Sequence, residues 1–326
     1  MSAPAEVEGF DAGPLGRLAL SRSAVNRATQ RRTDPEWIEA AWSDPRTRVV
    51  VVHASQALAR TVDGRPELVF VPTAAAPAGT RFFLGVDDDE TAYFGVSAVA
   101  DGEKWAWRPE PGAEPISLRL AGALLSDRDA GLLTHAVALA NWHDTHTHCP
   151  LCGAATVPAP AGHLTVCPVD NTEHFPRLDP AVIMLVTDQD DRCLLARNAL
   201  WPKGRMSVLA GFVEPGESAE HAVVREVFEE AAIVVGQVRY LGSQPWPMPR
   251  SLMLGYQAVA AGDQSIAVDE EEIGEARWFT RAEMRAALDA GELGIAPTSS
   301  IARRLIEYWY GAELPDGAAG WGPPNR

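Results

Sequence analysis

One cluster of glutamates restricts the possible folds of this chain more than any other feature. Glu226, Glu229 and Glu230 stand at i, i+3 and i+4, so a helix over about 218–231 would carry all three carboxylates on one face. Like charges placed in this way repel by a few tenths of a kcal/mol per neighbouring pair. A hard divalent cation such as Mg²⁺ would relieve the repulsion, because it prefers carboxylate oxygens and keeps waters and phosphates as its other ligands. The alternative is a solvated acidic face.

The residues around these glutamates complete a longer pattern. It runs Gly-x5-Glu-x7-Arg-Glu-apolar-x-Glu-Glu-x-Gly-apolar and is similar to the box of the Nudix hydrolases, with matches at Gly211, Glu217, Arg225, Glu226, Val227, Glu229, Glu230 and Ile233. Ala232 stands where that family usually has Gly, at a helix end where a left-handed conformation is common. Keeping that conformation with Ala should cost roughly 1 kcal/mol. The opposite face is predicted to bury four apolar residues, Val223, Val224, Val227 and Phe228.

The resemblance implies an α/β (α+β) protein with a Nudix α/β/α sandwich. It also implies hydrolysis of a nucleoside diphosphate linked to another group, with Mg²⁺ or Mn²⁺ as cofactor. The residues implied as catalytic are Glu226, Glu229 and Glu230, which are also implied metal ligands, and the resemblance leaves open which of them is the base. The carbonyl of Ala210 and the carboxylate of Glu272 are the other implied ligands, with Glu270 and Glu271 as neighbouring alternatives. Arg225 and Glu217 are expected to form an ion pair that braces loop and helix.

A second array follows the box, Ser243-Gln-Pro-Trp-Pro-Met-Pro-Arg-Ser251. Its alternating prolines stiffen the backbone, and Trp246 offers a ring for stacking. From the residues alone, a rigid loop whose Trp fills the core is an alternative. The array resembles the SQPWPFPxS sequence of NADH pyrophosphatases, with Met248 in place of Phe. The implied substrate-binding residues are Phe175, Ile183, Phe212, Gln244, Pro245, Trp246, Pro247, Met248, Pro249, Arg250, Ser251 and Ala302.

This second resemblance narrows the expected reaction. It implies hydrolysis of NADH or NAD⁺ to nicotinamide mononucleotide (reduced or oxidised) and AMP, and removal of NAD caps from RNA 5′ ends. A homodimer is implied as well. The net charge of −16 disfavours extensive RNA contacts, although a cap alone could enter a pocket. Alternatives are a Nudix hydrolase of another nucleotide, such as ADP-ribose, and a catalytically silent nucleotide sensor.

The cysteines predict a zinc-ribbon-like segment that is incomplete. Cys149-x2-Cys152 and Cys167-x2-Asp170 resemble the family's zinc ribbon, with Asp170 in place of the fourth Cys. Zn²⁺ accepts carboxylate oxygen, so Asp170 could complete the set. His163 and His174 are close in sequence, and loss of zinc is a further alternative. Cys193 reads as a core residue, and His143, His146 and His148 as a solvated linker rather than a metal site.

The length of 326 residues suggests two domains. The predicted parts are a β-rich N-terminal domain with a closing helix (1–143), the zinc-ribbon-like segment (144–176), the Nudix domain (177–313) and a loose tail (314–326). Strands are expected at 48–55, 66–72, 81–86, 91–99, 116–122, 181–188, 192–199, 206–213, 238–243, 252–260 and 276–280, and helices at 127–143, 218–231, 281–290 and 298–310. The longest central apolar run, Ala181–Val186, is far short of the roughly 20 residues that span a bilayer, and no apolar signal segment opens the chain. A cytoplasmic protein is expected, without membrane partners.

Overall fold

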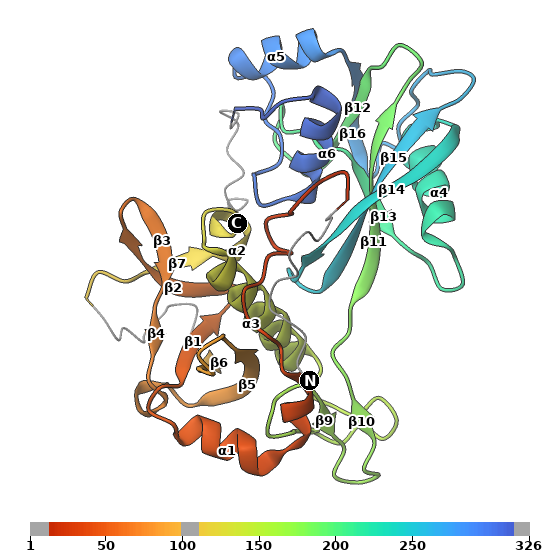
Figure 1. Cartoon of the computed structure of the whole chain (residues 1–326). Helices are drawn as coiled ribbons and strands as arrows, with labels where there is room; N and C mark the ends of the chain where they lie inside the picture. The colour runs from red at the N-terminus through yellow and green to blue at the C-terminus, as the bar shows by residue number, and fades with distance from the viewer. Residues whose placement is uncertain (1–12, 99–110, 316–326) are drawn as a thin grey trace. The chain divides into compact units, whose positions relative to one another are not determined.

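A computed structural model describes residues 13–98 and 111–315 (Figure 1). The described chain forms two compact units. Unit 1 contains residues 20–178 and 245–251, and unit 2 contains residues 13–19, 179–244 and 252–315. Most of the predicted tail lies outside the described residues, but Leu314 is buried in unit 2.

Unit 1 is built on a mixed sheet with helices. Its elements before the cysteine segment are η1 (Thr29–Thr33), α1 (Pro35–Ser43), β1 (Arg48–His53), β2 (Gln56–Val62), β3 (Arg65–Leu68), β4 (Phe70–Val71), η2 (Thr73–Ala75), β5 (Gly79–Val86), β6 (Ala92–Ala98), β7 (Glu114–Ser117), α2 (Leu118–Ala121) and α3 (Asp127–Thr145). The strand order is β3-β2-β1-β6-β5, with β4 paired to β1 and β7 to β2. Strands β1 and β6 run parallel, and the other pairs are antiparallel.

Strand β1 shows why its run of valines is wholly buried. Successive side chains of a strand point to opposite faces. Val50 and Val52 enter the core cluster that contains α3, while Val49 and Val51 enter the cluster that contains Ile38 of α1. Both faces of the strand are therefore covered, which explains an apolar run without alternation.

Two features of unit 1 differ from the sequence prediction. Residues 116–122 were expected to form a strand, but the strand β7 ends at Ser117 and helix α2 follows. Leu118 is buried while Leu120 is 45% exposed, so the alternating leucines reflect one core contact and not a strand face. Helix α1 and strand β2 were not predicted. Pro35 at the start of α1, with Asp34 accepting from the N–H of Trp37, is an N-terminal signal that the sequence did carry.

The cysteine segment of unit 1 adds a small antiparallel sheet. It consists of β8 (Val157–Pro158), β9 (Thr165–Val166) and β10 (Glu173–His174), in the order β10-β9-β8. Its turns carry the cysteines, as described below.

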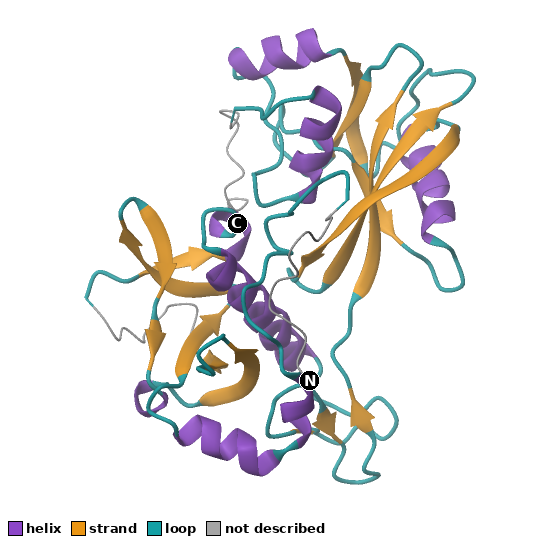
Figure 2. Ribbon diagram, in the orientation of Figure 1, coloured by secondary structure: helices purple, strands orange, loops and turns teal. Residues whose placement is uncertain are grey.

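Unit 2 confirms the predicted α/β/α sandwich. Its elements are β11 (Asp179–Thr187), β12 (Cys193–Asn198), β13 (Leu209–Phe212), α4 (Ala219–Ala231), β14 (Val235–Trp246), β15 (Ser251–Ala260), β16 (Ile273–Phe279), α5 (Arg281–Asp289) and α6 (Ile301–Tyr310), the last residues of β14 and the first of β15 being grouped with unit 1. The strand order is β14-β15-β11-β12-β16, with β13 paired to β11. Figure 2 shows α4 on one face of this sheet and α6 on the other.

The central strand β11 serves both cores of unit 2. Ile183 and Leu185 belong to the cluster with α6, whereas Val182, Met184 and Val186 belong to the cluster with α4. Cys193 is buried in the first cluster, as predicted. No helix within residues 13–98 and 111–315 is long and apolar enough to cross a membrane.

The buried face of α4 differs in part from the prediction. Val223 and Val227 are buried, but Val224 is 39% exposed and Phe228 55% exposed. Each helical residue is turned by about 100° from the one before it, so positions 224 and 228 lie on the flank of the 223/227 stripe. Glu230 completes the buried stripe instead, with only 9% of its surface exposed.

Candidate metal centre and substrate-binding array

The loop before α4 is shaped by its two glycines and its helix cap. Gly211 in β13 pairs with Val182 of β11, so the loop leaves from the middle of the sheet. Gly216 has φ +88°, a left-handed conformation that favours glycine. Ser218 then starts the helix, because its hydroxyl accepts from the N–H of His221 at 3.3 Å.

Arg225 connects this loop to the acidic face of α4. Its Nε and Nη2 donate to the two carboxylate oxygens of Glu217 at 2.9 and 2.8 Å, and Nη2 also donates to the carbonyl of Phe212 at 2.9 Å. Nη1 donates to Glu226 at 2.7 Å and to Glu229 at 3.0 Å. The hydrogen bonds from Arg225 lower the pKa of Glu217 to about 2. The geometry contains the predicted Arg225–Glu217 ion pair.

Glu226 lies against the backbone of the preceding strand. Its side chain is 12% exposed. A Cβ atom added to Gly211 would lie 1.9 Å from the Glu226 carboxylate carbon, so only a glycine leaves room for this carboxylate. Burial raises the pKa of Glu226, an effect that Arg225 opposes and the charges of Glu229 and Glu272 reinforce.

Glu230 is the most buried carboxylate of the group. Its Oε2 atom is buried and has no hydrogen-bond partner among the described residues. Burial, together with the charges of Glu226, Glu272 and Glu229, raises the pKa of Glu230 to about 8. A buried carboxylate oxygen without a donor is costly. A bound cation would remove this cost.

Glu272 is the loop carboxylate that faces the helix. The charge of Glu272 acts on both Glu226 and Glu230. Its backbone is held in the turn before β16, because the N–H of Ala199 donates to the Glu272 carbonyl at 2.8 Å and the N–H of Glu272 donates to Asp269 at 3.1 Å. Of the three adjacent candidates, Glu272 is the one whose charge raises these pKa values, and its role as a metal ligand stays a prediction.

This donor set fits a hard divalent cation. Glu226 and Glu230 lie one turn apart on α4, the charge of Glu272 acts on both, and the Glu230 oxygen without a partner is a ready ligand. Glu229 lies at the rim, with a 57% exposed side chain tied to Arg225. Ala210, the predicted carbonyl ligand, is exposed on β13 opposite Ile183.

The proline-rich array joins the end of β14 to the start of β15. Ser243 and Gln244 belong to unit 2, and residues 245–251 are grouped with unit 1. Gln244 is fully buried, and its Nε2 donates to the Ser299 carbonyl at 3.0 Å, so it braces the chain. Trp246 and Met248 are partly buried against the α3 core, and the Arg119 guanidinium lies 5.4 Å from the centre of the Trp246 ring. Trp246 therefore has a packing role in addition to any role in stacking.

The other predicted pocket residues fall into two groups. Phe175 and Phe212 present rings that are 60% and 59% exposed, as a stacking surface requires. Ile183 and Ala302 are buried together in the core cluster of unit 2. Their side chains pack internally, so their substrate contact stays a prediction.

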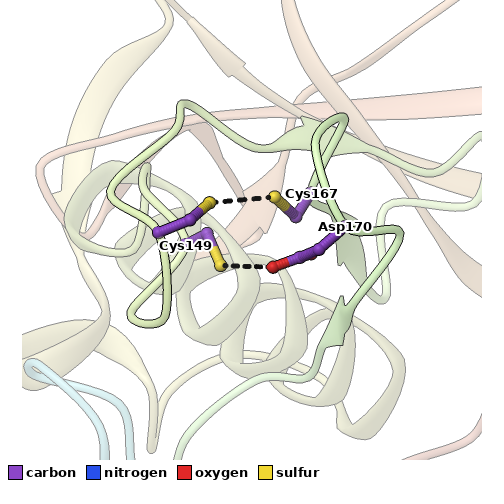
Figure 3. Close-up of side chains that lie close together, drawn as sticks. Cys149, Cys167 and Asp170 are labelled. Atoms are coloured by element: carbon purple, nitrogen blue, oxygen red, sulfur yellow. Dashed lines mark hydrogen bonds between the residues drawn. The ribbon is translucent and has the colours of Figure 1, made fainter.

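The cysteine segment brings four ligand atoms together. The thiol sulfurs of Cys149, Cys152 and Cys167 and a carboxylate oxygen of Asp170 all lie within 4.8 Å of one another (Figure 3). Cys152 Sγ and Cys167 Sγ are 3.4 Å apart, and Cys149 Sγ lies 3.8 Å from Asp170 Oδ2. Desolvation raises the pKa of Cys149, but hydrogen bonds from the backbone N–H groups of Cys152 and Leu151 outweigh it and bring the pKa to about 7. A thiolate is the form that binds a metal.

Among the nearby histidines, His174 hydrogen-bonds with the Cys149 side chain, whereas His163 and His143 have other partners. His163 Nε2 lies 2.6 Å from the Phe83 carbonyl, and His143 Nε2 lies 2.8 Å from the Gly162 carbonyl. His143 is buried, so the expectation that it lies in a solvated linker is wrong, whereas His148 is exposed as expected. Phe82 and Trp142 surround the His143 ring, which is a packing environment that the sequence around it did not reveal.

Comparison with known proteins covers most of the chain. Residues 46–142 match the NADH pyrophosphatase-like rudimentary NUDIX domain, residues 144–175 the NADH pyrophosphatase zinc ribbon domain, and residues 177–298 the NUDIX domain. Proteins called NAD-capped RNA hydrolase NudC from Mycobacterium bovis (strain BCG / Pasteur 1173P2) and Mycobacterium tuberculosis (strain ATCC 25618 / H37Rv) are each 42% identical over 313 residues, covering 90% of this chain and 95% of the relative. The NAD-capped RNA hydrolase NUDT12 of Homo sapiens is 42% identical over 338 residues, covering 89% of this chain and 72% of the relative.

Proposed function

Because this chain belongs to the NudC family of Nudix hydrolases, we propose that it hydrolyses the pyrophosphate of NADH or NAD⁺. The products are nicotinamide mononucleotide, reduced or oxidised, and AMP. The observation that carries the proposal is the buried carboxylate oxygen of Glu230, which has no partner in the described chain and is subject to the charges of Glu226 and Glu272. That arrangement suits a divalent cation, and a cation held by carboxylates suits a pyrophosphate.

Three glutamates would bind the cation, and a fourth, Glu229, would lie beside them. Glu226 and Glu230 hold the ion from α4, and Glu272 holds it from the loop before β16. When bound, Mg²⁺ or Mn²⁺ supplies neutralisation of the pyrophosphate charge. Arg225 keeps Glu226 and Glu229 oriented through its two Nη1 hydrogen bonds. Glu226, Glu229 and Glu230 are the residues to which we assign catalysis.

The dinucleotide would be recognised by exposed rings and by the proline-rich array. Phe212 directly follows Gly211 and has a ring that is 59% exposed, which suits stacking on a nicotinamide or adenine. Phe175 offers a second exposed ring, and residues 245–251 supply a stiff segment. Gln244 supports this segment from within the core.

Removal of NAD caps from RNA is a second candidate activity. It is favoured by the relatives that share 42% identity over most of this chain and are called NAD-capped RNA hydrolases. The net charge of −16 opposes a long RNA footprint, so recognition would be confined to the cap and the first nucleotides. A homodimer in the cytoplasm completes the proposal, with sedimentation velocity of the purified chain as the check on the dimer.

Product analysis tests the proposed reaction. The purified full chain is incubated with NADH, NAD⁺, NAD-capped RNA or ADP-ribose, with either Mg²⁺ or Mn²⁺, and the products are separated by chromatography. We expect nicotinamide mononucleotide and AMP from NAD(H), loss of turnover with EDTA, and loss of turnover in Glu230→Gln. Faster turnover of ADP-ribose would move the assignment to another nucleotide. No turnover of any substrate would favour a nucleotide sensor.

We also propose that Zn²⁺ occupies the group formed by Cys149, Cys152, Cys167 and Asp170. Three sulfurs and one carboxylate oxygen within 4.8 Å match the ligand types and number of a structural zinc site. Elemental analysis of the purified chain should give about one zinc per chain. Cys167→Ser should lose the metal, whereas Asp170→Cys should retain it against stronger chelators. A metal-free wild-type chain would show that packing alone holds these turns.

A further inference from the structure

The array that we assign to substrate binding has a backbone with few internal partners. Pro245, Pro247 and Pro249 have no N–H groups, so this segment cannot form a regular ladder of backbone hydrogen bonds. Pro249 is exposed, whereas Pro247 is buried, so the Pro247 carbonyl needs a donor, which a side chain elsewhere in unit 1 can supply.

Asn141 of helix α3 is that donor. Its Nδ2 atom lies 2.6 Å from the carbonyl oxygen of Pro247 and 3.4 Å from that of Pro249. An amide nitrogen has two hydrogens, so the short contact to Pro247 takes one of them and the longer contacts to Pro249 and the Ser55 hydroxyl share the other. One side chain thus reaches both carbonyls that flank Met248.

Ser55 holds Asn141 in this orientation. Its Oγ lies 3.1 Å from Asn141 Nδ2 and 3.5 Å from Asn141 Oδ1. Ser55 and Ala54 form the turn between β1 and β2, and both have left-handed backbones, with φ of +60° and +48°. Such a conformation strains a non-glycine residue, and the sheet of unit 1 carries this strain at the turn that presents the Ser55 hydroxyl to α3.

A surface cavity opens beside these contacts. It has a volume of about 410 Å³, and its wall includes Ser55, Asn141, Met248 and Pro249. Asn141 therefore stands between the array and open space, where a change in its side chain alters the shape of the array without removing any residue of it.

We propose that Asn141 is a positioning residue for substrate binding, which sets the conformation of residues 246–249 through the carbonyls of Pro247 and Pro249. This inference rests on the proposed function. It gives the N-terminal part of the chain a role in the reaction, because α3 and the β1–β2 turn shape a segment that the sequence places between two strands of the Nudix domain. Asn141 contacts no reacting atom in this role, so it acts on substrate affinity and not on the chemical step.

Steady-state kinetics of the full chain test the proposal. Asn141→Leu keeps the branched shape of the side chain and removes both N–H donors. Leaving a carbonyl without its donor costs about 1–3 kcal/mol, so we expect KM for NADH to rise roughly 5- to 100-fold, with kcat changed less than about twofold. Ser55→Ala, which only loosens Asn141, should raise KM by a smaller factor, and it covers the case in which Asn141→Leu folds poorly. Thr145→Val is the matched control, because Thr145 lines the same cavity but its hydroxyl bonds to the carbonyls of Asn141 and Trp142 and to the His146 ring, and not to the array.

A binding measurement separates this proposal from the proposed function. NAD⁺ is titrated calorimetrically into Glu230→Gln and into the double variant that also carries Asn141→Leu. The Kd should rise between the two by the same factor as KM rises between wild type and Asn141→Leu. Equal affinity and equal KM in Asn141→Leu would overturn the role of Asn141 and leave the proposed reaction standing. A loss confined to kcat would overturn it as well. If the wild-type chain neither binds nor hydrolyses NAD(H), the proposed function fails and this inference fails with it.

Discussion

Arg225 holds Glu217 by two parallel hydrogen bonds, from Nε to Oε1 at 2.9 Å and from Nη2 to Oε2 at 2.8 Å. The same guanidinium donates to the Phe212 carbonyl and to two glutamates of α4. A planar group with five donors can make all these contacts, whereas an ammonium ion cannot. The orientation of the acidic face therefore depends on the shape of this side chain as well as on its charge.

Arg225→Lys should consequently lose activity although it keeps the charge. We expect kcat/KM for NADH to fall at least about tenfold and the free energy of unfolding to fall by about 1–3 kcal/mol, because several charge-assisted hydrogen bonds are lost. Kinetics and urea denaturation measure the two effects. Arg285→Lys is the control, since Arg285 forms an exposed pair with Asp289 on α5 and such pairs contribute little. Wild-type kinetics in Arg225→Lys would contradict the bracing role.

Gly211→Ala should damage the cation site directly. The new Cβ would overlap the Glu226 carboxylate, which would have to move by an ångström or more. A displacement of about 1 Å can cost 100-fold in rate, so we expect a loss of that order, together with weaker activation by Mn²⁺. The titration of activity with Mn²⁺ measures both.

Gly216→Ala is the matched control for that change. Gly216 has φ +88° but no atom within 4 Å of an added Cβ, so the substitution strains the backbone without filling the site. It should cost stability by about 1 kcal/mol and retain most of the activity. If both variants lost activity equally, backbone strain and not the space for Glu226 would explain the effect.

Ala232→Gly should stabilise the protein. Ala232 ends α4 in a left-handed conformation, with φ +58° and ψ +22°. This is the position at which the family usually has Gly. Glycine adopts this conformation without the steric penalty, so we expect a gain of roughly 1 kcal/mol in the free energy of unfolding. Ala290→Gly at the end of α5 is the control, because Ala290 has φ −76° and should gain nothing. An unchanged unfolding midpoint in Ala232→Gly would contradict the assigned strain.

Acid should destabilise unit 1 through its buried histidines. Burial lowers the pKa of His135, His143 and His163 from the ordinary value of 6.5, for His163 to about 4. Below pH 6.5 the unfolded chain then binds more protons than the folded chain. The free energy of unfolding therefore falls as the pH is lowered from about 6.5 towards 4, by up to about 1.4 kcal/mol per pH unit for each histidine.

Urea denaturation at several pH values between roughly 4 and 7.5 measures that slope. His163→Gln keeps a donor for the Phe83 carbonyl but does not titrate, so the slope should decrease by up to about 1.4 kcal/mol per pH unit. His148→Gln, at an exposed position, should leave the slope unchanged. An identical slope in wild type and His163→Gln would show that this ring does not control the acid response.

The sequence predicted the parts of the fold that depend on local spacing. The helix at 218–231 follows from the spacing of its apolar and acidic residues. The sequence could not assign Phe228, because an apolar residue one step off the buried stripe looks the same in the chain whether or not something covers it. It also could not choose among Glu270, Glu271 and Glu272, since a loop has no period to set its register.

Contacts distant in sequence were the other gap. Asn141 precedes the Pro247 carbonyl by 106 residues, and nothing in the local pattern of α3 distinguishes it from an ordinary polar helix residue. His143 was predicted to lie in a solvated linker for the same reason, because the Gly162 carbonyl that accepts from it lies in a later turn. The cysteine group was predictable, since its four ligands come from two tight turns with recognisable spacing.

Residues 13–19, at the start of the described chain, belong to unit 2, whose other residues come late in the sequence. Leu15 and Leu18 are 2% and 3% exposed in the core of unit 2, although more than 150 residues of unit 1 follow them before unit 2 resumes. Unit 2, which contains the Nudix domain, is therefore not one contiguous segment of the sequence. A fragment that starts near residue 177 would lack Leu15 and Leu18, and each missing leucine would lower the free energy of unfolding by about 2–5 kcal/mol. A permuted chain that joins residues 13–19 to the C-terminal end of unit 2 could restore these contacts. A fusion protein that carries this domain must therefore include residues 13–19 as well as the C-terminal part of the chain.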